Sequence, residues 1–184
     1  MNLPNKLTLL RVILVPFFIL FFYLECLPGN INFLIALLIF AIASVTDALD
    51  GHIARKNNLV TNFGKFLDPL ADKVLVTAAL CCFVEKGIIS AVPLIIIIAR
   101  EFMVSGLRLV TAGEGVVVAA GIWGKLKTAF TMVTIVLVLV FCSFSLETKM
   151  NILTQILIWI STVLTIISGL VYLKGYWKYI NTDK

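Results

Sequence analysis

Residues 31–55, INFLIALLIFAIASVTDALDGHIAR, join a long apolar run to two aspartates near its end. No charged residue occurs between positions 31 and 46, and Asp47 and Asp50 follow. An uncharged apolar run of this length suits a helix surrounded by lipid or by other helices. Carboxylates beside such a run are costly to keep near hydrocarbon, so both aspartates are candidates for function rather than for packing.

Composition places the rest of the chain in lipid as well. Of the 184 residues, 61% are hydrophobic and only 14% are charged. A water-soluble fold of this size cannot bury that much apolar surface. The apolar runs over residues 129–146 and 152–173 are each long enough to cross a hydrocarbon core as a helix. We therefore expect an all-α integral membrane protein.

Six transmembrane helices fit the apolar runs best, within a single membrane domain over residues 1–184. The first run follows Lys6 and contains Arg11, as a secretory signal peptide also would. No small-residue cleavage site follows it, so we expect it to remain as a membrane helix. The expected spans lie near residues 7–24, 31–54, 66–86, 88–110, 126–146 and 151–178.

The basic residues predict the orientation of these spans. An even number of spans puts both termini on one side of the membrane. With the termini inside, all but two of the 15 lysines and arginines fall toward the cytoplasm, the exceptions being Lys86 and Lys149. This positive-inside bias predicts cytoplasmic termini and places any chemistry on the cytoplasmic face.

A second pair of aspartates opens the next apolar run. Asp47 and Asp50 are three residues apart, and Asp68 and Asp72 are four apart, so each pair shares one face of its own helix. The two helices are expected to run antiparallel across a short loop. Both pairs should then lie at the same depth, near the cytoplasmic surface.

Four carboxylates in one place require cations between them, because they otherwise repel and raise each other's pKa. Mg²⁺ and Mn²⁺ prefer oxygen ligands of this kind, so we expect the four aspartates to form a divalent metal site. The alternative is a belt of surface ion pairs with Arg55, Lys65 and Lys73, which would be worth little. Such a belt would not need two pairs in register flanked by Gly51 and Gly64.

The spacing of this segment is that of a known family. Residues 47–72 read D-x-x-D-G-x-x-A-R, then eight further residues, then G-x-x-x-D-x-x-x-D. This pattern resembles the signature of the CDP-alcohol phosphatidyltransferases at every fixed position. Three other segments are similar to parts of the bacterial phosphatidylglycerolphosphate synthases of that family, namely LPNKLTLLR at 3–11, AREF at 99–102 and GKLKT at 124–128.

The resemblance implies a homodimer of six-helix subunits in the plasma membrane of a bacterium, each with a polar cavity open to the cytoplasm. By likeness, Asp47, Asp50, Asp68 and Asp72 would hold one or two Mg²⁺ or Mn²⁺ ions per subunit. Asp72 would also act as the general base. The CDP-diacylglycerol site would be formed by Asn5, Thr8, Gly51, Ala54, Arg55 and Gly64.

The implied reaction moves the phosphatidyl group of CDP-diacylglycerol to sn-glycerol 3-phosphate, giving phosphatidylglycerol phosphate and CMP. Membrane lipids are the other expected partners, and no nucleic acid is expected. Because the acceptor carries a phosphate, we expect a basic pocket beside the aspartates, formed by Arg108, Lys125 and Lys127, with Arg100 deeper. Membrane anchoring is the alternative role for the two lysines, and a buried pairing with Glu101 or an aspartate is the alternative for Arg100.

Two other functions are compatible with the sequence. Within the family, the acceptor could instead be inositol phosphate, serine or phosphatidylglycerol. From a different class, acidic residues in a membrane protein could serve a divalent-cation transporter. Transporter sites usually lie near the bilayer midplane between broken helices or repeated halves, whereas these aspartates lie at one edge and the sequence shows no repeat.

Overall fold

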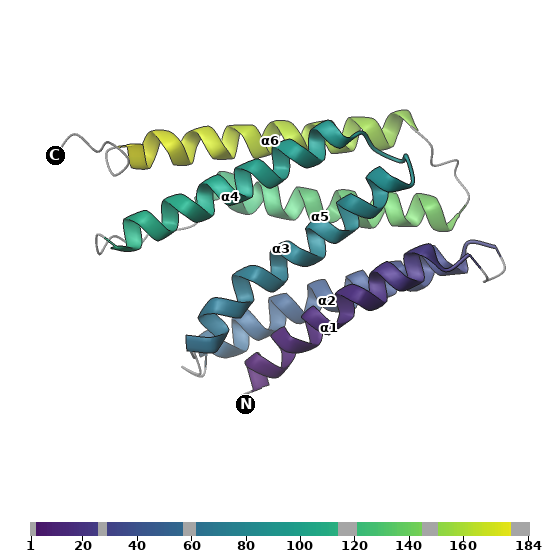
Figure 1. Ribbon diagram of the computed structural model, residues 1–184, viewed down its shortest axis with the longest axis horizontal. Helices are drawn as coiled ribbons and strands as arrows, with labels where there is room; N and C mark the ends of the chain where they lie inside the picture. Colours follow the sequence, from purple (N-terminus) through teal and green to yellow (C-terminus); the bar gives the residue numbers. More distant parts are fainter. Residues whose placement is uncertain (1–2, 26–28, 57–61, 114–120, 145–150, 178–184) are drawn as a thin grey trace. The chain divides into compact units, whose positions relative to one another are not determined.

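The computed structural model describes residues 3–25, 29–56, 62–113, 121–144 and 151–177, drawn as ribbon in Figure 1. Within these ranges the side chains of residues 3–5, 47–56, 62–70, 72 and 112–113 lie outside the description. The described part of the chain is helical and contains no strand, which confirms the all-α prediction. Its helices are α1 (Leu3–Tyr23), α2 (Ile31–Lys56), α3 (Asn62–Glu85), α4 (Ala91–Gly113), α5 (Ile122–Ser143) and α6 (Ile152–Tyr176).

Local sequence signals explain several helix ends. Gly29 and Gly87 adopt positive φ angles of 65° and 70° in the turns before α2 and after α3, a conformation that glycine reaches without steric cost. Asn151 caps α6, because its side chain accepts a hydrogen bond from the Leu153 backbone N–H at 3.0 Å. These signals separate the apolar runs at the start of α2, the end of α3 and the start of α6.

The chain divides into two compact units. The first comprises Met1–Lys86 and Ile135–Lys149, and the second comprises Gly87–Thr134 and Met150–Lys184. Helix α5 therefore contributes its first half to the second unit and its second half to the first. The prediction of a single membrane domain stays a prediction.

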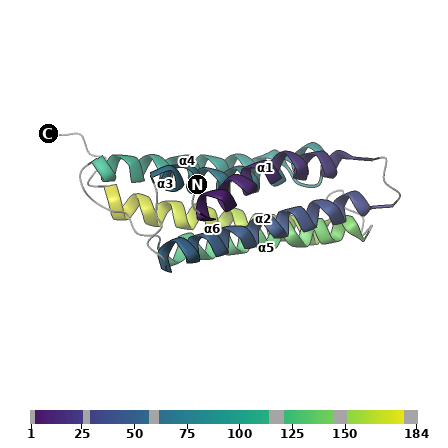
Figure 2. The same ribbon diagram turned by 90° about the horizontal axis from the view of Figure 1, so that it is seen from below.

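In the first unit α1 packs on α2 and α3, and Figures 1 and 2 both show α1 running alongside α2. Four phenylalanines, each at most 1% exposed, fill the space between these helices: Phe18, Phe22, Phe40 and Phe83. The ring of Phe22 lies 5.9 Å from those of Phe18 and Phe83, between centroids. This aromatic core ties together the helices on which all four predicted metal ligands occur.

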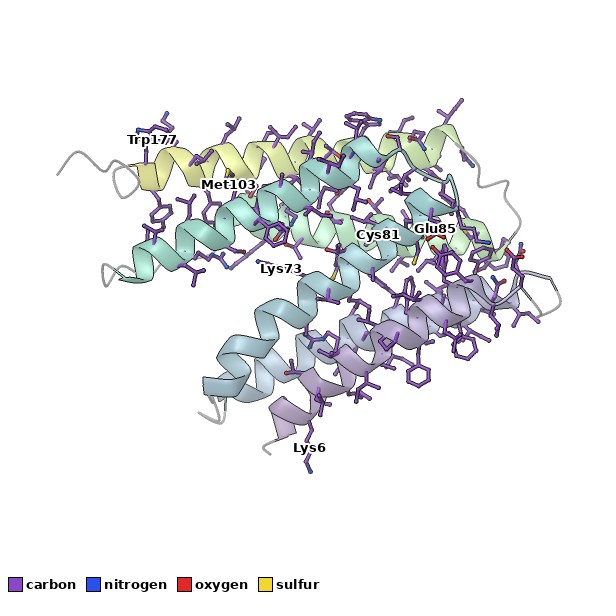
Figure 3. The ribbon with its side chains drawn as sticks, in the orientation of Figure 1. Lys6, Lys73, Cys81, Glu85, Met103 and Trp177 are labelled. Atoms are coloured by element: carbon purple, nitrogen blue, oxygen red, sulfur yellow. The ribbon has the colours of Figure 1, made fainter. Side chains whose placement is uncertain are left out.

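Polar contacts join the end of α1 to the end of α3, where Figure 3 labels Glu85. The Tyr23 hydroxyl donates a hydrogen bond to Glu85 Oε2 at 2.6 Å, and Lys86 Nζ donates to Glu25 Oε1 at 2.5 Å. The hydrogen bond from Lys86 holds the pKa of the exposed Glu25 carboxyl below its usual value. These contacts lie at the opposite end of α3 from Asp68 and Asp72.

In the second unit α4 packs on α6. The buried face of α6 is small and polar, with Ser161, Thr162, Thr165 and Ser168 each 0% exposed. Thr162 and Thr165 donate to backbone carbonyls four residues earlier in their own helix, at 2.8 Å in both cases. Such internal hydrogen bonds let hydroxyl groups lie in an apolar environment without a partner from another helix.

The described residues support a membrane protein but do not reach six spans. By length and composition, three helical segments could cross a bilayer: Lys6–Tyr23, Ile122–Ser143 and Ile152–Tyr176. A shorter apolar segment covers Ile31–Thr46. Helix α4 is less apolar than these three long segments, because it carries Arg100, Glu101 and Arg108. Large apolar side chains are exposed along the helices, as expected where lipid replaces water, and Leu38, Ile95, Leu109 and Ile152 are examples.

Candidate active site

The predicted metal ligands all lie in helices of the first unit. Asp47 and Asp50 are in the C-terminal part of α2, and Asp68 and Asp72 are in the N-terminal half of α3. The segment between the two helices, residues 57–61, is short, as the sequence predicts. The four side chains lie outside the described residues, so their coordination of a metal stays a prediction. Among the described side chains, no group of three or more histidines, cysteines, aspartates or glutamates could hold a metal ion.

The predicted nucleotide site draws on the same helices. Thr8 is fully buried in α1, which packs on both aspartate-bearing helices. The remaining predicted residues lie in the first turn of α1, the last turns of α2 and the first turn of α3, with side chains outside the description: Asn5, Gly51, Ala54, Arg55 and Gly64.

Arg11 lies in this unit and is not among the residues that the sequence predicts for the site. It follows Thr8 by three residues, shares its helix face, and is likewise 0% exposed. A buried guanidinium inside a membrane helix is costly and marks a functional position by default. That signal was present in the sequence, where Arg11 interrupts an apolar run.

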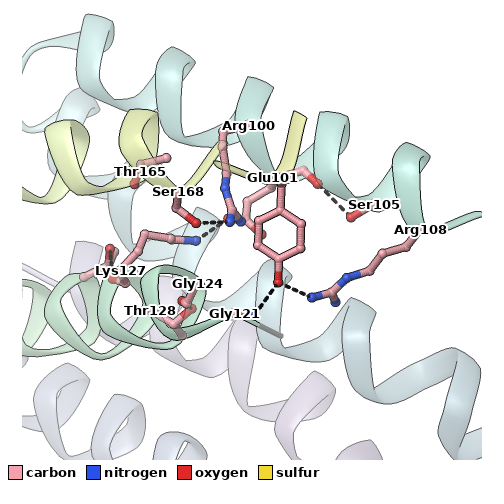
Figure 4. A network of polar contacts seen from close by, with 12 residues as sticks. Arg100, Glu101, Ser105, Arg108, Gly121, Gly124, Lys127, Thr128, Thr165 and Ser168 are labelled. Carbon is pink, nitrogen blue, oxygen red and sulfur yellow. Dashed lines mark hydrogen bonds and ion pairs between the residues drawn. The ribbon is translucent and has the colours of Figure 1, made fainter. Parts of the chain in front are cut away.

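Two of the four predicted acceptor-binding residues are held by a carboxylate in the second unit (Figure 4). Arg100 Nη1 donates to Glu101 Oε1 at 3.1 Å, and Lys127 Nζ donates to the same oxygen. Arg100 also donates to the hydroxyl of Ser168 in α6. The side chains of Lys127 and Arg100 are only 7% and 10% exposed. We call Arg100, Glu101, Lys127 and Ser168 the Glu101 cluster.

The close approach of α4 and α6 at this cluster depends on a glycine. A Cβ atom on Gly169 would lie 3.1 Å from Arg100 Cγ and 3.1 Å from Met103 Cε. The absence of a side chain there lets the arginine stem lie against the backbone of α6. The glycine thus helps to bring the guanidinium within reach of Ser168.

The other two predicted residues are exposed. Arg108 Nη2 donates a hydrogen bond to the Tyr172 hydroxyl at 3.3 Å, and the Gly121 backbone N–H donates to the same oxygen at 3.0 Å. Lys125 is exposed and lies one turn after Gly121, in α5. We call Arg108, Gly121 and Tyr172 the Tyr172 junction, of which Figure 4 labels Arg108 and Gly121. The junction adjoins the Glu101 cluster, because the Tyr172 ring centroid lies 5.5 Å from Arg100 Cζ.

The charges of this region favour an anionic ligand. Glu101 supplies one negative charge against two cations, so the Glu101 cluster keeps a net positive charge. The exposed Arg108 and Lys125 add to it. Arginine and lysine bind phosphate oxygens through charge-assisted hydrogen bonds. A phosphate is therefore a suitable ligand for this part of the second unit.

Most of the residues that organise these cations were not predicted from the sequence. Glu101 was expected only as an alternative partner for Arg100, and no role was expected for Ser168, Gly169 or Tyr172. The available signal was weak, because serine, glycine and tyrosine are common in membrane helices. Their contacts with α4 and α5 depend on helix packing that no local pattern reports.

Comparison with known proteins finds relatives that are similar to nearly the whole chain. The family model for CDP-alcohol phosphatidyltransferase matches residues 1–167. A protein of Bacillus subtilis (strain 168) is 42% identical over 99% of this chain and 98% of its own. A Rickettsia bellii protein is 40% identical over 97% of each chain, and a Haemophilus influenzae protein is 44% identical over 94% of this chain and 92% of its own. Each of the three is named CDP-diacylglycerol–glycerol-3-phosphate 3-phosphatidyltransferase.

Proposed function

Because this chain belongs to the CDP-alcohol phosphatidyltransferase family, we propose that it transfers the phosphatidyl group of CDP-diacylglycerol to sn-glycerol 3-phosphate. The products are phosphatidylglycerol phosphate and CMP. The observation that carries this conclusion is identity of about 40% with the named relatives over nearly the full length of both chains. The acceptor predicted from the three flanking segments is the one in the relatives' names.

The aspartates fit a divalent metal by the chemistry of their donor atoms. Four carboxylates on two successive helices of one unit are hard oxygen ligands, which suit Mg²⁺ or Mn²⁺. Asp47, Asp50, Asp68 and Asp72 would hold one or two ions per subunit. When bound, the metal would offset the charge of the diphosphate and stabilise CMP as the leaving group.

The protein's own residues supply the remaining chemistry. Asp72 takes the proton from the attacking hydroxyl of glycerol 3-phosphate as general base. The hydroxyl oxygen forms a bond to the phosphatidyl phosphorus, and the bond from that phosphorus to the bridging oxygen of CMP breaks. CMP leaves with the bridging oxygen. Direct attack requires no covalent enzyme intermediate, so no nucleophilic side chain is needed.

The lipid substrate accounts for the membrane fold. Its acyl chains remain in the bilayer beside the exposed apolar faces of the helices, while its diphosphate stays at the polar boundary. Asn5, Thr8, Gly51, Ala54, Arg55 and Gly64 are proposed to contact the cytidine diphosphate part.

The acceptor's phosphate is proposed to bind mainly to Arg108 and Lys125. Both are exposed, whereas Arg100 and Lys127 are largely buried and already engaged with Glu101. Arg100 and Lys127 then act chiefly through the positive field of the Glu101 cluster. Of the four residues predicted to bind the acceptor, two are thus proposed to contact its phosphate directly.

The topology and assembly are part of the same proposal. We infer six spans from the apolar runs, and we infer from the distribution of basic residues that both termini and the active site face the cytoplasm. The plasma membrane of a bacterium is inferred from the family resemblance. A homodimer is proposed from the family resemblance.

Parallel acceptor assays test the proposed function. Purified protein in detergent is given CDP-diacylglycerol, Mg²⁺ and one acceptor at a time: glycerol 3-phosphate, inositol phosphate, serine or phosphatidylglycerol. Of the four acceptors, we expect only glycerol 3-phosphate to give CMP release. EDTA should abolish this release, and added Mg²⁺ or Mn²⁺ should restore it. If CMP were released with another acceptor instead, the protein would be a member of the family with a different acceptor specificity. Divalent-cation uptake into proteoliposomes without any CMP release would support the transporter.

A further inference from the structure

We propose that Tyr172 is a positioning residue for acceptor binding, which holds Arg108 and the start of α5 in place for the acceptor's phosphate. This inference rests on the proposed function. Tyr172 lies in α6, one turn before Tyr176 at the end of that helix, and is 5% exposed. Its side chain contacts Arg108 of α4 and the backbone of Gly121 just before α5, two residues that Figure 4 labels.

One oxygen atom connects these elements. The Tyr172 hydroxyl accepts a hydrogen bond from Arg108 Nη2 at 3.3 Å and another from the Gly121 backbone N–H at 3.0 Å. Accepting both uses the two lone pairs of the hydroxyl oxygen. The backbone bond does not depend on the side chain at position 121, so it anchors the chain itself just before α5 begins.

The ring of Tyr172 adds a second contact to the cations. Its centroid lies 5.5 Å from the Cζ atom of Arg100 and 5.8 Å from that of Arg108, within the range of cation–π attraction. Gly124 of α5 lies beside this ring, since a Cβ atom there would be in ordinary van der Waals contact with the tyrosine oxygen at 3.4 Å. The tyrosine thus contacts both arginines and the first turn of α5.

Such an anchor matters for Arg108 because this side chain is exposed. A free exposed arginine loses conformational freedom when it binds an anion, and that loss weakens binding. Fixing one Nη atom to a buried hydroxyl reduces the loss while leaving other N–H groups of the guanidinium for a phosphate. The same oxygen fixes the backbone that leads to Lys125. Tyr172 therefore prepares both of the cations proposed to contact the acceptor.

Tyr172→Phe tests the proposal, because it keeps the ring and removes only the hydroxyl. We expect the KM for glycerol 3-phosphate to rise about two- to tenfold, which corresponds to the net contribution of a single hydrogen bond such as the one that holds Arg108. The kcat and the KM for CDP-diacylglycerol should stay unchanged. Tyr176→Phe is the matched control. Tyr176 stacks on Tyr172 one turn further along α6, with centroids 6.2 Å apart, and its ring is also retained. It should leave all three constants unchanged.

The Arg108→Ala background separates positioning from a general structural effect. We expect Arg108→Ala alone to raise the KM for glycerol 3-phosphate roughly ten- to a hundredfold, since a charge-assisted contact is lost. Adding Tyr172→Phe should then raise it further by less than Tyr172→Phe does in the wild-type background, because only the start of α5 is left to be positioned. A full additional increase in the double variant would overturn the positioning role.

Other outcomes distinguish this proposal from the proposed function. If Arg108→Ala raises that KM but Tyr172→Phe does not, or if Tyr172→Phe raises both KM values equally, the role of Tyr172 is refuted and the function stands. If the wild type does not use glycerol 3-phosphate, the function itself fails. Should Tyr172→Phe not fold in detergent, Arg108→Lys supplies the test. It keeps the charge but loses the planar fork, so its KM for glycerol 3-phosphate should rise, and an unchanged KM would overturn the proposal.

Discussion

Replacing Glu101 by glutamine should destabilise the protein more than removing either of its cationic partners. Glu101 Oε1 accepts from both Arg100 and Lys127, so the loss of its charge leaves two cations without their anion. Removing Lys127 instead leaves the pair of Arg100 and Glu101 intact. The second unit should therefore tolerate Lys127→Met better than Glu101→Gln.

The size of the effect follows from burial. Breaking a buried ion pair by removing one partner costs about 3–5 kcal/mol. The Glu101 side chain is 22% exposed, so water screens part of the interaction and about 2–3 kcal/mol is the expected loss. For a chain of this length each kcal/mol lowers Tm by roughly 2–4 °C, which gives a fall of roughly 4–12 °C for Glu101→Gln. Lys127→Met should lower Tm by less than half as much.

Thermal unfolding in detergent, followed by tryptophan fluorescence, measures these shifts. Glu25→Gln is the control, because Glu25 is in an exposed ion pair with Lys86 and its side chain is 76% exposed. Such surface pairs contribute little, so its Tm should stay near that of the wild type. The reasoning is refuted if Glu101→Gln is no less stable than Lys127→Met, or if Glu25→Gln destabilises the protein as much as Glu101→Gln.

Three further predictions concern the metal site, the topology and helix packing. Asp50→Asn or Asp68→Asn should lower turnover at least about a hundredfold while leaving Tm nearly unchanged, since a lost ligand removes several kcal/mol of transition-state stabilisation. In a variant whose four native cysteines are replaced by serine, a single cysteine inserted after Asn181 should react with a membrane-impermeant maleimide only in opened vesicles, not in intact cells. Gly106→Ala should raise stability by about 0.5–1 kcal/mol, because no atom of the described residues lies within 4 Å of the new methyl group and alanine favours helix. Gly169→Ala should lack that gain, because its methyl group would meet two α4 side chains at 3.1 Å.

Each of these predictions has a contrary result. Wild-type turnover in either asparagine variant would refute the metal site. Labelling in intact cells would mean that the orientation is inverted. Equal stabilisation by the two alanine substitutions, measured as Tm in detergent, would show that α4 and α6 are not in tight contact at Gly169.

The sequence predicts the helices well because apolar runs and turn residues report them directly. The expected span at 31–54 corresponds to α2, Ile31–Lys56, and the expected span at 151–178 contains α6, Ile152–Tyr176. The start of α3 is less accurate, since the helix begins at Asn62, four residues before the expected span at 66–86. Apolar runs report burial in lipid, whereas a helix continues through polar residues as long as its backbone hydrogen bonds are satisfied.

The site is predictable only in part, for a similar reason. The aspartate motif is local, so its residue types and spacing suffice to place it on two successive helices. The cation network depends on contacts between distant segments, such as Lys127 with Glu101 and Arg100 with Ser168. Sequence spacing does not reveal which of several basic residues meets an acid from another helix. The sequence placed Arg100 deeper than Arg108, but it did not show that Lys127 and Ser168 also lie beside the Arg100–Glu101 pair.

The hydroxyl groups of α6 bear on how the protein is assembled in the membrane. Thr162 and Thr165 satisfy their own hydrogen bonds within the helix, so this segment can enter the bilayer as an independent span without waiting for a neighbour. Ser161 differs, because it lies 2.6 Å from the hydroxyl of Thr131 in α5. Membrane insertion and contact with α5 thus depend on different residues of one helix face. A chain with Ser161→Ala should still insert into the membrane, but its α6 should bind α5 less tightly.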